Sequence, residues 1–421
     1  MKLLVFAHVP PPYHGQSYAV NLMLDSFGGD HRKRRAKSDS ETPDRFGIEC
    51  YHVNAQFSRG LEDIGEFRSV KLVQLFIYCL EAIWCRFRYG VTNFYYVPAP
   101  GKHIALYRDW LVMLICRPFF DRIILHWHAA GLAKWLETAV SIRTRSLTYR
   151  LLKNADLSII LSDFNRRDAE KLAARRIVVV NAGLPDPCPR FEQDILPRRR
   201  SRLAEQKKIV SGGSPQTKAN DAAIHVLYLA HCMREKGMFD SVAGVALANE
   251  KLAAEKSPLR FKLTLIGAFV SNTEKSELEN LIKQRRLQNV VECLGFVSDE
   301  RKAQALTDAD LFCFPTYYRA ESFGAVLVEA MAFGLPIVTT RWRSIPEILP
   351  PDYPGLVDPR SPDQIADALL RLASSDHAEM LREIFLRRYT LERNLAAMAE
   401  AIHSVESAEQ APPLKAVLQV P

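Results

Sequence analysis

Short apolar runs alternate with longer segments of helical periodicity along most of the chain. This alternation predicts parallel βαβ units. In the first half, buried strands are predicted at residues 3–7, 47–53, 93–97, 122–127, 157–161 and 176–180. A second series is predicted at residues 224–230, 261–266, 290–294, 311–315 and 336–339. We therefore expect an α/β protein with two Rossmann-like domains.

A polar and basic segment, residues 192–220, separates the two series. It contains Arg198-Arg199-Arg200, Lys207-Lys208 and Ser211-Gly212-Gly213-Ser214-Pro215. Such composition is typical of a solvated linker or loop. The predicted boundaries are an N-terminal domain over 1–190, a linker over 191–221, a C-terminal domain over 222–380, a helix over 381–404 and a flexible tail over 405–421.

The bulk composition fits two soluble domains and an anionic partner. The 421 residues are 48% hydrophobic and 25% charged, with a net charge of +8. Nucleic acid, an anionic membrane face or a phosphate-bearing small molecule would each match that charge. Basic residues without an interleaved aromatic platform argue against nucleic acid. Neither half has the G-x-G-x-x-G and following acid of a nicotinamide oxidoreductase.

Cysteine spacing and the N-terminus indicate a cytoplasmic chain. The eight cysteines are scattered, without C-x-x-C or metal-ligand spacing, so we expect reduced and mostly buried thiols. The N-terminal apolar run is short and soon reaches Pro10-Pro11-Pro12, which favours a first strand over a signal peptide. No run reaches the roughly 18 apolar residues of a membrane span.

The segment from Pro315 to Pro336 carries the clearest chemistry. A predicted strand ends at Pro315, and Ser322 is a suitable N-cap for a helix that ends before Gly334 and Pro336. The free N–H groups near Phe323 and Gly324, together with the helix dipole, would form an anion site that suits a diphosphate.

Two glutamates in this segment have separate positions. Glu321 precedes the predicted helix, and Glu329 lies about 10 Å further along it. A ligand that touches both must be long, as a nucleotide sugar is, with its sugar and phosphate at the helix start and its ribose further along. In the other interpretation, Glu321 is a helix-start carboxylate and Glu329 is a solvated surface residue.

The spacing Glu-x7-Glu, between Pro-Thr and Glu-Ala-x-Ala-x-Gly-x-Pro, resembles the signature of family 4 of the retaining GT-B glycosyltransferases. The resemblance implies two Rossmann-like domains that face each other across a cleft, with a C-terminal helix crossing back to the first domain. It also implies that Glu321 contacts the donor sugar, that the backbone of Ser322, Phe323 and Gly324 contacts its hydroxyls and phosphate, and that Glu329 binds the ribose.

The second half contains three further matches to this family. Lys236 in His231-Cys232-Met233-Arg234-Glu235-Lys236-Gly237 corresponds to the lysine that neutralises the leaving diphosphate, whereas His231 stands where the family has arginine. Arg234 is the candidate to replace that charge. Phe296 and Val297 follow a strand where the nucleobase loop lies, and Ile345-Pro346-Glu347-Ile348 resembles a structural turn of the family.

The first half resembles the family less closely. Gly15, in the Pro11–Ser17 loop after the first strand, is the candidate for contact with donor phosphate or acceptor. In His126-Trp127-His128, the resemblance nominates His128 for the active cleft. Packed histidines satisfied by carbonyl groups are the alternative, and a metal site lacks a third ligand nearby. Asn181-Ala182-Gly183-Leu184 resembles an interdomain turn.

The resemblance implies a retaining, metal-independent glycosyltransferase without a cofactor. Its donor would be a nucleotide-diphosphate sugar, and its acceptor a glycan or lipid-linked hydroxyl in polysaccharide or glycolipid synthesis. An inactive sugar-nucleotide-binding scaffold is the alternative, because His231 breaks one motif. Segments 70–89 and 104–120 mix apolar and basic residues, which indicates either contact with the anionic inner face of a membrane or core helices with basic ends.

Overall fold

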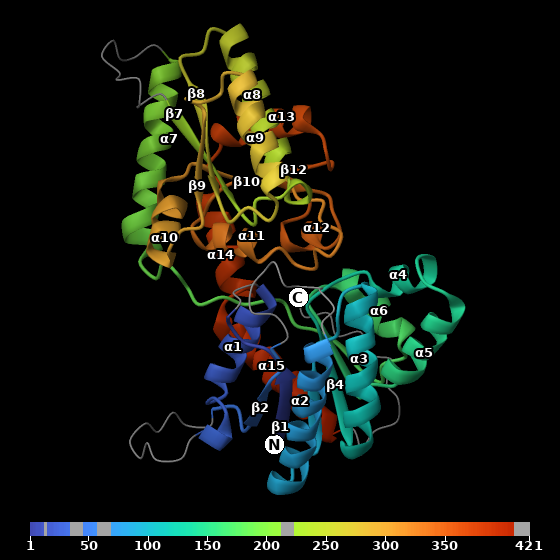
Figure 1. The fold of residues 1–421 in the computed structure, drawn as a ribbon. Coiled ribbons are helices and arrows are strands. Elements are labelled where there is room, and N and C mark those ends of the chain that lie inside the picture. The colour runs from blue at the N-terminus through green and yellow to red at the C-terminus, as the bar shows by residue number, and fades with distance from the viewer. Residues whose placement is uncertain (12–14, 34–44, 57–68, 212–222, 408–421) are drawn as a thin grey trace. The chain divides into compact units, whose positions relative to one another are not determined.

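The computed structural model describes residues 1–11, 15–33, 45–56, 69–211 and 223–407. The chain divides into two compact units (Figure 1). Unit 1 comprises residues 1–182 together with residues from 392 onward, and unit 2 comprises residues 183–391. Each unit contains one six-stranded parallel sheet with accompanying helices, which confirms the predicted two-domain α/β fold.

The sheet of unit 1 forms from the six predicted apolar runs. Its strands are β1 (Lys2–Ala7), β2 (Glu49–Asn54), β3 (Asn93–Tyr96), β4 (Arg122–Trp127), β5 (Leu157–Ile160) and β6 (Ile177–Val179). Their spatial order is β2-β1-β3-β4-β5-β6. Leu4 is opposite both Tyr51 and Phe94 in the parallel register. Because the central strands are covered on both faces, they are apolar at nearly every position.

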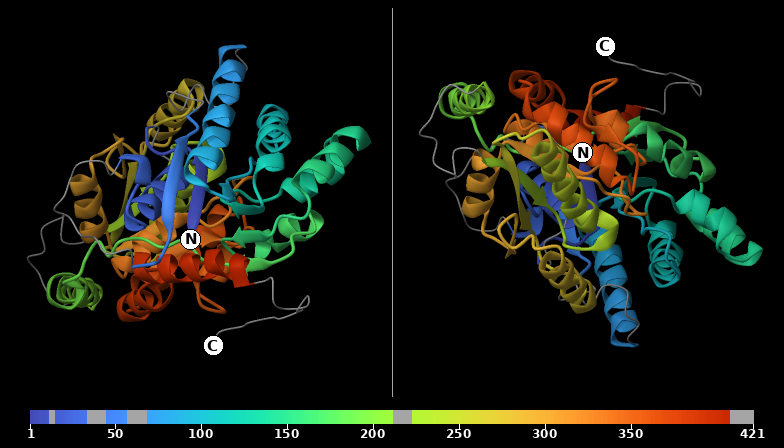
Figure 2. Two further views of the ribbon diagram at one scale, coloured as in Figure 1. Left: turned by 90° about the horizontal axis from the view of Figure 1, so that it is seen from below. Right: turned by 90° about the horizontal axis from the view of Figure 1, so that it is seen from above.

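Helices cover both faces of this sheet. The helices of unit 1 are α1 (Gly15–Ser26), η1 (His31–Lys33), α2 (Ser69–Tyr89), α3 (His103–Cys116), η2 (Arg117–Phe119), α4 (Leu132–Thr138), α5 (Ile142–Leu152), η3 (Asp163–Asn165), α6 (Arg166–Lys171) and α15 (Leu391–Ser407). Figures 1 and 2 show α2 and α3 on one face and α15 on the other. The core under α2 includes Phe6 and Phe94, whose ring centroids lie 5.7 Å apart.

The sheet of unit 2 contains the five predicted runs and one more strand. Its strands are β7 (Ala223–Leu229), β8 (Arg260–Ile266), β9 (Val291–Gly295), β10 (Leu311–Phe314), β11 (Ile337–Thr340) and β12 (Leu356–Val357). The order is β12-β11-β10-β7-β8-β9. The sequence did not predict β12, because two residues are too few to show a periodicity.

Unit 2 has helices on both sides of its sheet (Figure 1). They are η4 (Phe191–Ile195), α7 (Leu196–Val210), η5 (Arg234–Lys236), α8 (Met238–Ala254), α9 (Asn272–Gln284), α10 (Asp299–Asp308), α11 (Ala325–Ala332), α12 (Ile345–Ile348), α13 (Pro362–Ala373) and α14 (Ala378–Arg388). Gly244 of α8 lets α13 approach closely, since a Cβ there would lie 2.4 Å from Ile365 Cγ2.

The predicted linker over 191–221 is wrong where the structure describes it. Residues 191–210 form η4 and α7 within unit 2, while 212–221 fall outside the described residues. The buried Arg199 guanidinium donates hydrogen bonds to the carbonyl oxygens of Leu306, Ala309 and Phe333. Arginine-rich composition suggested a solvated segment, but here an arginine satisfies helix-terminal carbonyl groups. Burial lowers the Arg199 pKa to about 10.

The C-terminal segment also differs from the predicted single helix over 381–404. It forms α14 in unit 2 and α15 in unit 1, with a break at Tyr389-Thr390. At the break, Leu184 N donates to the Tyr389 carbonyl at 3.0 Å, and Leu391 N donates to the Leu184 carbonyl at 2.7 Å. In unit 1, the side chain of Asn394 donates to the Asn181 carbonyl at 2.7 Å. The unit boundary after Ala182 falls in the predicted interdomain turn. Residues 408–421 of the predicted tail lie outside the described residues.

The thiols agree with the prediction of unpaired cysteines. All eight are free, seven are buried, and Cys293 is exposed. Among the helices in the described ranges, none combines the length and apolar character needed to cross a bilayer.

Candidate functional site

The charged candidates of unit 2 meet where the sheet topology reverses direction. β7 and β10 are neighbours in the sheet, although the chain visits β8 and β9 between them. The connections after β7 and β10 therefore leave to opposite sides, which opens a crevice at the carboxyl ends of the strands in sheets of this type. Lys236 lies in the connection after β7, and Glu321 lies in the connection after β10.

Lys236 and Glu321 form a direct ion pair at this switch point. Lys236 Nζ donates to Glu321 Oε2 at 2.7 Å, and both side chains are largely buried. Thr316 Oγ1 lies 3.4 Å from the same oxygen, and the Lys236 ammonium lies 4.7 Å from the ring centroid of Tyr318. Burial, followed by the charge of Glu321, raises the pKa of Tyr318. No residue in the described part of the chain hydrogen-bonds to the other oxygen, Glu321 Oε1.

Hydroxyl groups after and within β11 hold the connection that carries Glu321. Thr339 Oγ1 donates to the Phe314 carbonyl at 2.7 Å, and Thr340 Oγ1 donates to the Thr316 carbonyl. Ser344 Oγ donates to the Ser322 carbonyl at 2.6 Å. These buried contacts fix the backbone on both sides of Glu321, so the carboxylate is placed before any ligand binds.

Gly237 allows the Lys236 connection to approach this segment closely. Its φ is +84°, and a Cβ on Gly237 would lie 2.4 Å from the Pro315 carbonyl oxygen. A side chain at this position would therefore clash with the backbone and adopt an unfavourable left-handed conformation. Tyr317 N donates to the Glu235 carbonyl at 2.8 Å, which joins the two connections directly.

The helix after Glu321 begins later than the sequence suggested. α11 starts at Ala325, its N-cap is Gly324 with φ +69°, and no side chain caps it. Ser322 is therefore not the N-cap, because its carbonyl is bonded to Ser344 and the chain turns at Gly324. The helical rise applies only from Ala325 to Glu329, about 6 Å. The free backbone N–H groups at the helix start are therefore those of the first residues of α11, and Phe323 is not one of them.

Glu329 is held by a lysine that the sequence did not single out. Lys302 Nζ of α10 lies 3.2 Å from Glu329 Oε1. Glu329 is therefore a fixed, partly buried carboxylate and not a freely solvated one. Lys302 was missed because a lysine in an exposed-looking helix has no local signal that reports a partner 27 residues away.

His231 and Arg234 do not provide equivalent positive charges. Burial, followed by the charge of Lys236, lowers the pKa of His231, which is therefore neutral at pH 7. The Arg234 guanidinium forms an ion pair with Glu277 and lies 4.0 Å from the ring centroid of Phe239. Arg234 thus faces α8 and α9, whereas Lys236 faces Glu321.

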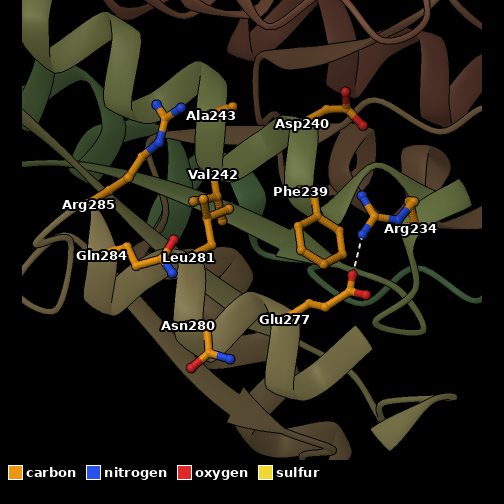
Figure 3. A pocket seen from close by; sticks show the side chains of 10 residues that line it. All are labelled: Arg234, Phe239, Asp240, Val242, Ala243, Glu277, Asn280, Leu281, Gln284 and Arg285. Atoms are coloured by element: carbon orange, nitrogen blue, oxygen red, sulfur yellow. Dashed lines mark hydrogen bonds and ion pairs between the residues drawn. The ribbon is translucent and has the colours of Figure 1, made fainter. Parts of the chain in front are cut away.

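Figure 3 shows the pocket beside Arg234, which has a volume of about 550 Å³. The Glu277 carboxylate points towards the guanidinium, and Asn280 and Arg285 lie on the α9 side. The pocket lining contains neither Lys236 nor Glu321. It is therefore separate from the ion pair, although Arg234 and Lys236 belong to the same short helix.

The predicted nucleobase residues lie at the carboxyl end of β9. Gly295 ends this strand with φ +68°, and its carbonyl accepts a hydrogen bond from Gly267 N at 2.9 Å. Phe296 is 80% exposed and Val297 is partly buried. A large exposed aromatic ring after a glycine turn is available for stacking, but β7 and β8 lie between its strand and β10.

The candidates of unit 1 also lie at the carboxyl ends of strands. Gly15 begins α1 after β1, while residues 12–14 of its loop fall outside the described ranges. A Cβ on Gly15 would meet nothing within 4 Å. His128 follows β4, and its ring centroid is 4.1 Å from that of His126. Tyr95 Oη lies 2.5 Å from His126 Nδ1, and burial holds the His126 pKa well below its usual range.

Thr316 is a second residue that the sequence did not assign to the site. It lies in the Pro-Thr pair of the motif, yet its contact with Glu321 and with the Glu235 carbonyl emerges only in the fold. Within the described ranges, no group of three or more histidine, cysteine, aspartate or glutamate side chains is arranged to hold a metal ion.

Curated relatives match the chain over part of their length. An O-antigen chain mannosyltransferase B of Escherichia coli is 28% identical over 53% of this chain and 53% of its own. A phosphatidyl-myo-inositol mannosyltransferase of Mycobacterium leprae is 34% identical over 34% of this chain and 33% of its own. Three further relatives are matched over 52%, 40% and 47% of their own lengths. The chain therefore spans about half the length of the curated proteins it matches.

A solved structure matches nearly the whole chain. The HepE protein of Anabaena, crystallised in complex with UDP, has a TM-score of 0.62 at 16% identity, covering 96% of this chain and 100% of that one. This likeness shows the two-unit α/β fold known as GT-B. The family model for glycosyl transferases group 1 matches residues 214–407, which include the Lys236–Glu321 pair and Glu329. This part of the chain therefore belongs to the glycosyl transferases group 1 family.

Proposed function

We propose that the protein is a retaining, metal-independent glycosyltransferase. It moves a sugar from a nucleotide diphosphate to a hydroxyl of a glycan or lipid-linked acceptor, in polysaccharide or glycolipid synthesis. The observation that carries the proposal is the buried Lys236–Glu321 pair at the switch point before α11. A cation, a carboxylate and a helix N-terminus at one switch point suit a ligand with hydroxyl groups and a diphosphate.

The contacts of each residue suggest its role with the donor. Glu321 Oε1 accepts a hydrogen bond from a hydroxyl of the sugar, while Oε2 stays with Lys236. The diphosphate lies near Lys236 and the backbone of Ser322, Phe323 and Gly324. Glu329 accepts the ribose hydroxyls, and its pairing with Lys302 keeps the carboxylate oriented. Phe296 and Val297 contact the base.

In the proposed reaction, the bond between the anomeric carbon and the diphosphate oxygen breaks. The acceptor oxygen forms its bond to that carbon on the same face, and its proton passes to the departing phosphate oxygen. Lys236 stabilises the negative charge that grows on the diphosphate, a role in which a fixed cation is most effective when it is partly shielded from water. His128 and Gly15 of unit 1 are the candidates for contact with the acceptor or the donor phosphate.

The related proteins support the choice of substrates. HepE was crystallised with UDP, which supports a nucleoside diphosphate as leaving group. The names of the O-antigen chain and phosphatidyl-myo-inositol enzymes describe glycan and lipid acceptors.

A panel of sugar nucleotides tests the proposal through release of the nucleoside diphosphate with and without candidate acceptors. We expect one donor to be consumed, Glu321→Gln to abolish turnover while nucleotide still binds, and Glu329→Ala to weaken nucleotide binding about tenfold, or about 1.4 kcal/mol. His128→Ala should reduce turnover without changing the affinity for free nucleotide.

Two outcomes would contradict the proposal. Nucleotide binding without turnover of any donor would identify the inactive scaffold that His231 suggests. Unchanged nucleotide binding in Glu329→Ala would show that the ligand does not reach α11.

A further inference from the structure

Helix α2 of unit 1 presents an apolar surface to the solvent. The side chains that pack against the sheet are small or medium in size and include Leu75, Cys79, Ala82 and Cys85, all nearly inaccessible. The exposed ones are also apolar and include three large aromatic side chains: Leu72, Val73, Phe76, Ile77, Leu80, Trp84 and Phe87. Trp84 is 52% exposed and Phe87 is 71% exposed. The helix is therefore apolar on both sides.

The exposed side chains form one continuous stripe. At 100° per residue, the seven positions fall within an arc of about 140° that is opposite the buried face. All seven residues are apolar, and the four charged residues of α2 lie outside this arc. Glu81 forms an ion pair with Arg32, and Arg86 donates to the Phe119 carbonyl at 2.8 Å. No charge therefore interrupts the stripe.

The apolar surface continues onto the neighbouring helix. α2 and α3 lie side by side on the same face of the sheet (Figures 1 and 2). Ile104, Tyr107 and Leu114 are exposed on α3 at helical spacing. Phe119 of η2 joins the two helices, with its ring centroid 6.0 Å from that of Phe87. We call these side chains, together with the α2 stripe, the α2–α3 surface.

The helices at and beside the α2–α3 surface carry an excess of positive charge. α3 packs against α5, and the three helices together carry seven lysines and arginines against two acidic residues, a formal charge of +5. Both acidic residues are already paired, Glu81 with Arg32 and Asp109 with Arg108. A large apolar patch that includes tryptophan and phenylalanine, on helices with excess positive charge, has the composition of a helix that lies in the interface of a membrane.

We propose that the α2–α3 surface docks onto an anionic lipid bilayer, with α2 lying parallel to the membrane plane. The apolar side chains enter the boundary between headgroups and acyl chains, and the surrounding arginines interact with anionic headgroups. The charge favours this partner over a second copy of the chain, because the excess positive charge of α2, α3 and α5 would oppose the same excess on an identical copy in a symmetric dimer. The inference concerns the surface of unit 1 and does not depend on the glycosyl-transfer reaction.

Vesicle co-sedimentation with the full chain tests the proposal. We expect the protein to bind vesicles that contain phosphatidylglycerol and to bind pure phosphatidylcholine at least tenfold more weakly. Binding to the anionic vesicles should weaken as salt is raised, because the electrostatic part is screened. Absence of binding to both vesicles would overturn the proposal, as would equal binding to both.

Substitutions of exposed side chains test whether vesicle binding depends on the α2–α3 surface and not on another part of the molecule. Ile77→Glu with Phe87→Glu should reduce binding to anionic vesicles at least tenfold. The matched control is Val210→Glu with Leu386→Glu, which places the same two charges on exposed apolar positions of unit 2 and should leave binding unchanged. An unchanged thermal midpoint in each variant shows that the fold is retained. A dimer that dissociates in the Ile77→Glu and Phe87→Glu variant would instead identify a second copy as the partner.

Tryptophan fluorescence identifies the face that touches lipid. Lipids with brominated acyl chains quench a tryptophan that enters the acyl region, so we expect the wild type to be quenched on binding. Trp84→Phe keeps an aromatic side chain and should still sediment with vesicles, but it should lose most of the quenching. Quenching that persists in Trp84→Phe would show that another face makes the contact and would overturn the proposal.

Discussion

Both units contain a six-stranded parallel sheet, but the carboxyl ends of their strands carry different chemistry. In unit 2 the order β12-β11-β10-β7-β8-β9 places the switch point between β7 and β10, where Lys236 and Glu321 pair. In unit 1 the order β2-β1-β3-β4-β5-β6 places it between β1 and β3, and the candidates there are the uncharged Gly15 and, one strand further, His128. Similar architecture therefore brings loops together, while the residues of those loops decide what can bind.

The two units also differ in which side chains they hold in place and which they expose to solvent. The charged candidates of unit 2 are held by partners before a ligand arrives, as Lys302 holds Glu329. Unit 1 keeps His126 neutral through burial, yet exposes a long apolar stripe on α2. Preorganised charge suits recognition of a small anionic ligand, and exposed apolar surface suits a large and fluid partner.

The largest expected effect is on turnover, and it distinguishes Lys236 from Arg234, two cations of the same short helix η5. Lys236→Met should lower the turnover number about 100- to 1000-fold, roughly 3–4 kcal/mol, because it removes the cation beside the leaving diphosphate. Arg234→Met should lower it less than about fivefold, because its guanidinium is engaged with Glu277 and Phe239. Steady-state turnover of the donor measures both. Equal losses in the two variants would show that the position of the charge relative to Glu321 is unimportant.

The next prediction compares how replacement of one glycine in each unit changes the free energy of unfolding. Gly237→Ala should lower the free energy of unfolding by about 2–4 kcal/mol, because its Cβ would lie 2.4 Å from the Pro315 carbonyl oxygen at a positive φ. Gly15→Ala should change it by less than about 0.5 kcal/mol, because a Cβ there has free space. Urea unfolding followed by circular dichroism provides both values. A loss of donor affinity in the stable Gly15→Ala variant would support the predicted phosphate contact in unit 1.

A smaller effect concerns the histidine that replaces the family arginine. Because the His231 pKa lies below its usual value, the imidazole carries no charge at pH 7 and gains one only as the pH falls through that lowered pKa. His231→Arg should therefore raise donor affinity at pH 7 about fivefold, roughly 1 kcal/mol. Isothermal titration of the nucleotide against pH provides the measurement.

His231→Gln is the control for this comparison. The wild type should bind the nucleotide more tightly than His231→Gln only at pH values below the His231 pKa, and equally at pH 8. A constant difference between them at every pH would show that hydrogen bonding, and not charge, is the contribution of His231.

The smallest expected effect tests the support of Glu329. Lys302→Met should weaken nucleotide binding about threefold, within the range of up to about 1 kcal/mol for a partly exposed ion pair. In a Glu329→Ala background the same substitution should have no effect, since Lys302 acts through that carboxylate. A double-mutant cycle on nucleotide affinity measures the coupling. A threefold loss that persists without Glu329 would mean that Lys302 contacts the ligand itself.

The strands of both sheets could be predicted because buried strands are short, contiguous and apolar. The predictions from sequence were wrong where a local pattern is compatible with two different structures. The arginine-rich composition predicts a solvated linker, but Arg199 is buried against three carbonyl oxygens. Ser322 has the chemistry of an N-cap, yet its carbonyl is held by Ser344 and the helix begins after Gly324. In both cases, the competing interaction comes from a residue distant in the sequence.

Local sequence patterns were enough to predict the alternating α/β architecture, the two series of strands and the order of Glu321 and Glu329 along their segment, because these depend on neighbouring residues. Only the tertiary structure decided that Lys236 pairs with Glu321, 85 residues away, and that Lys302 supports Glu329. It also decided which side of α2 is exposed. The helix is apolar on two opposite sides, so periodicity could not show which one faces the sheet, and only packing placed Leu75, Cys79, Ala82 and Cys85 against it.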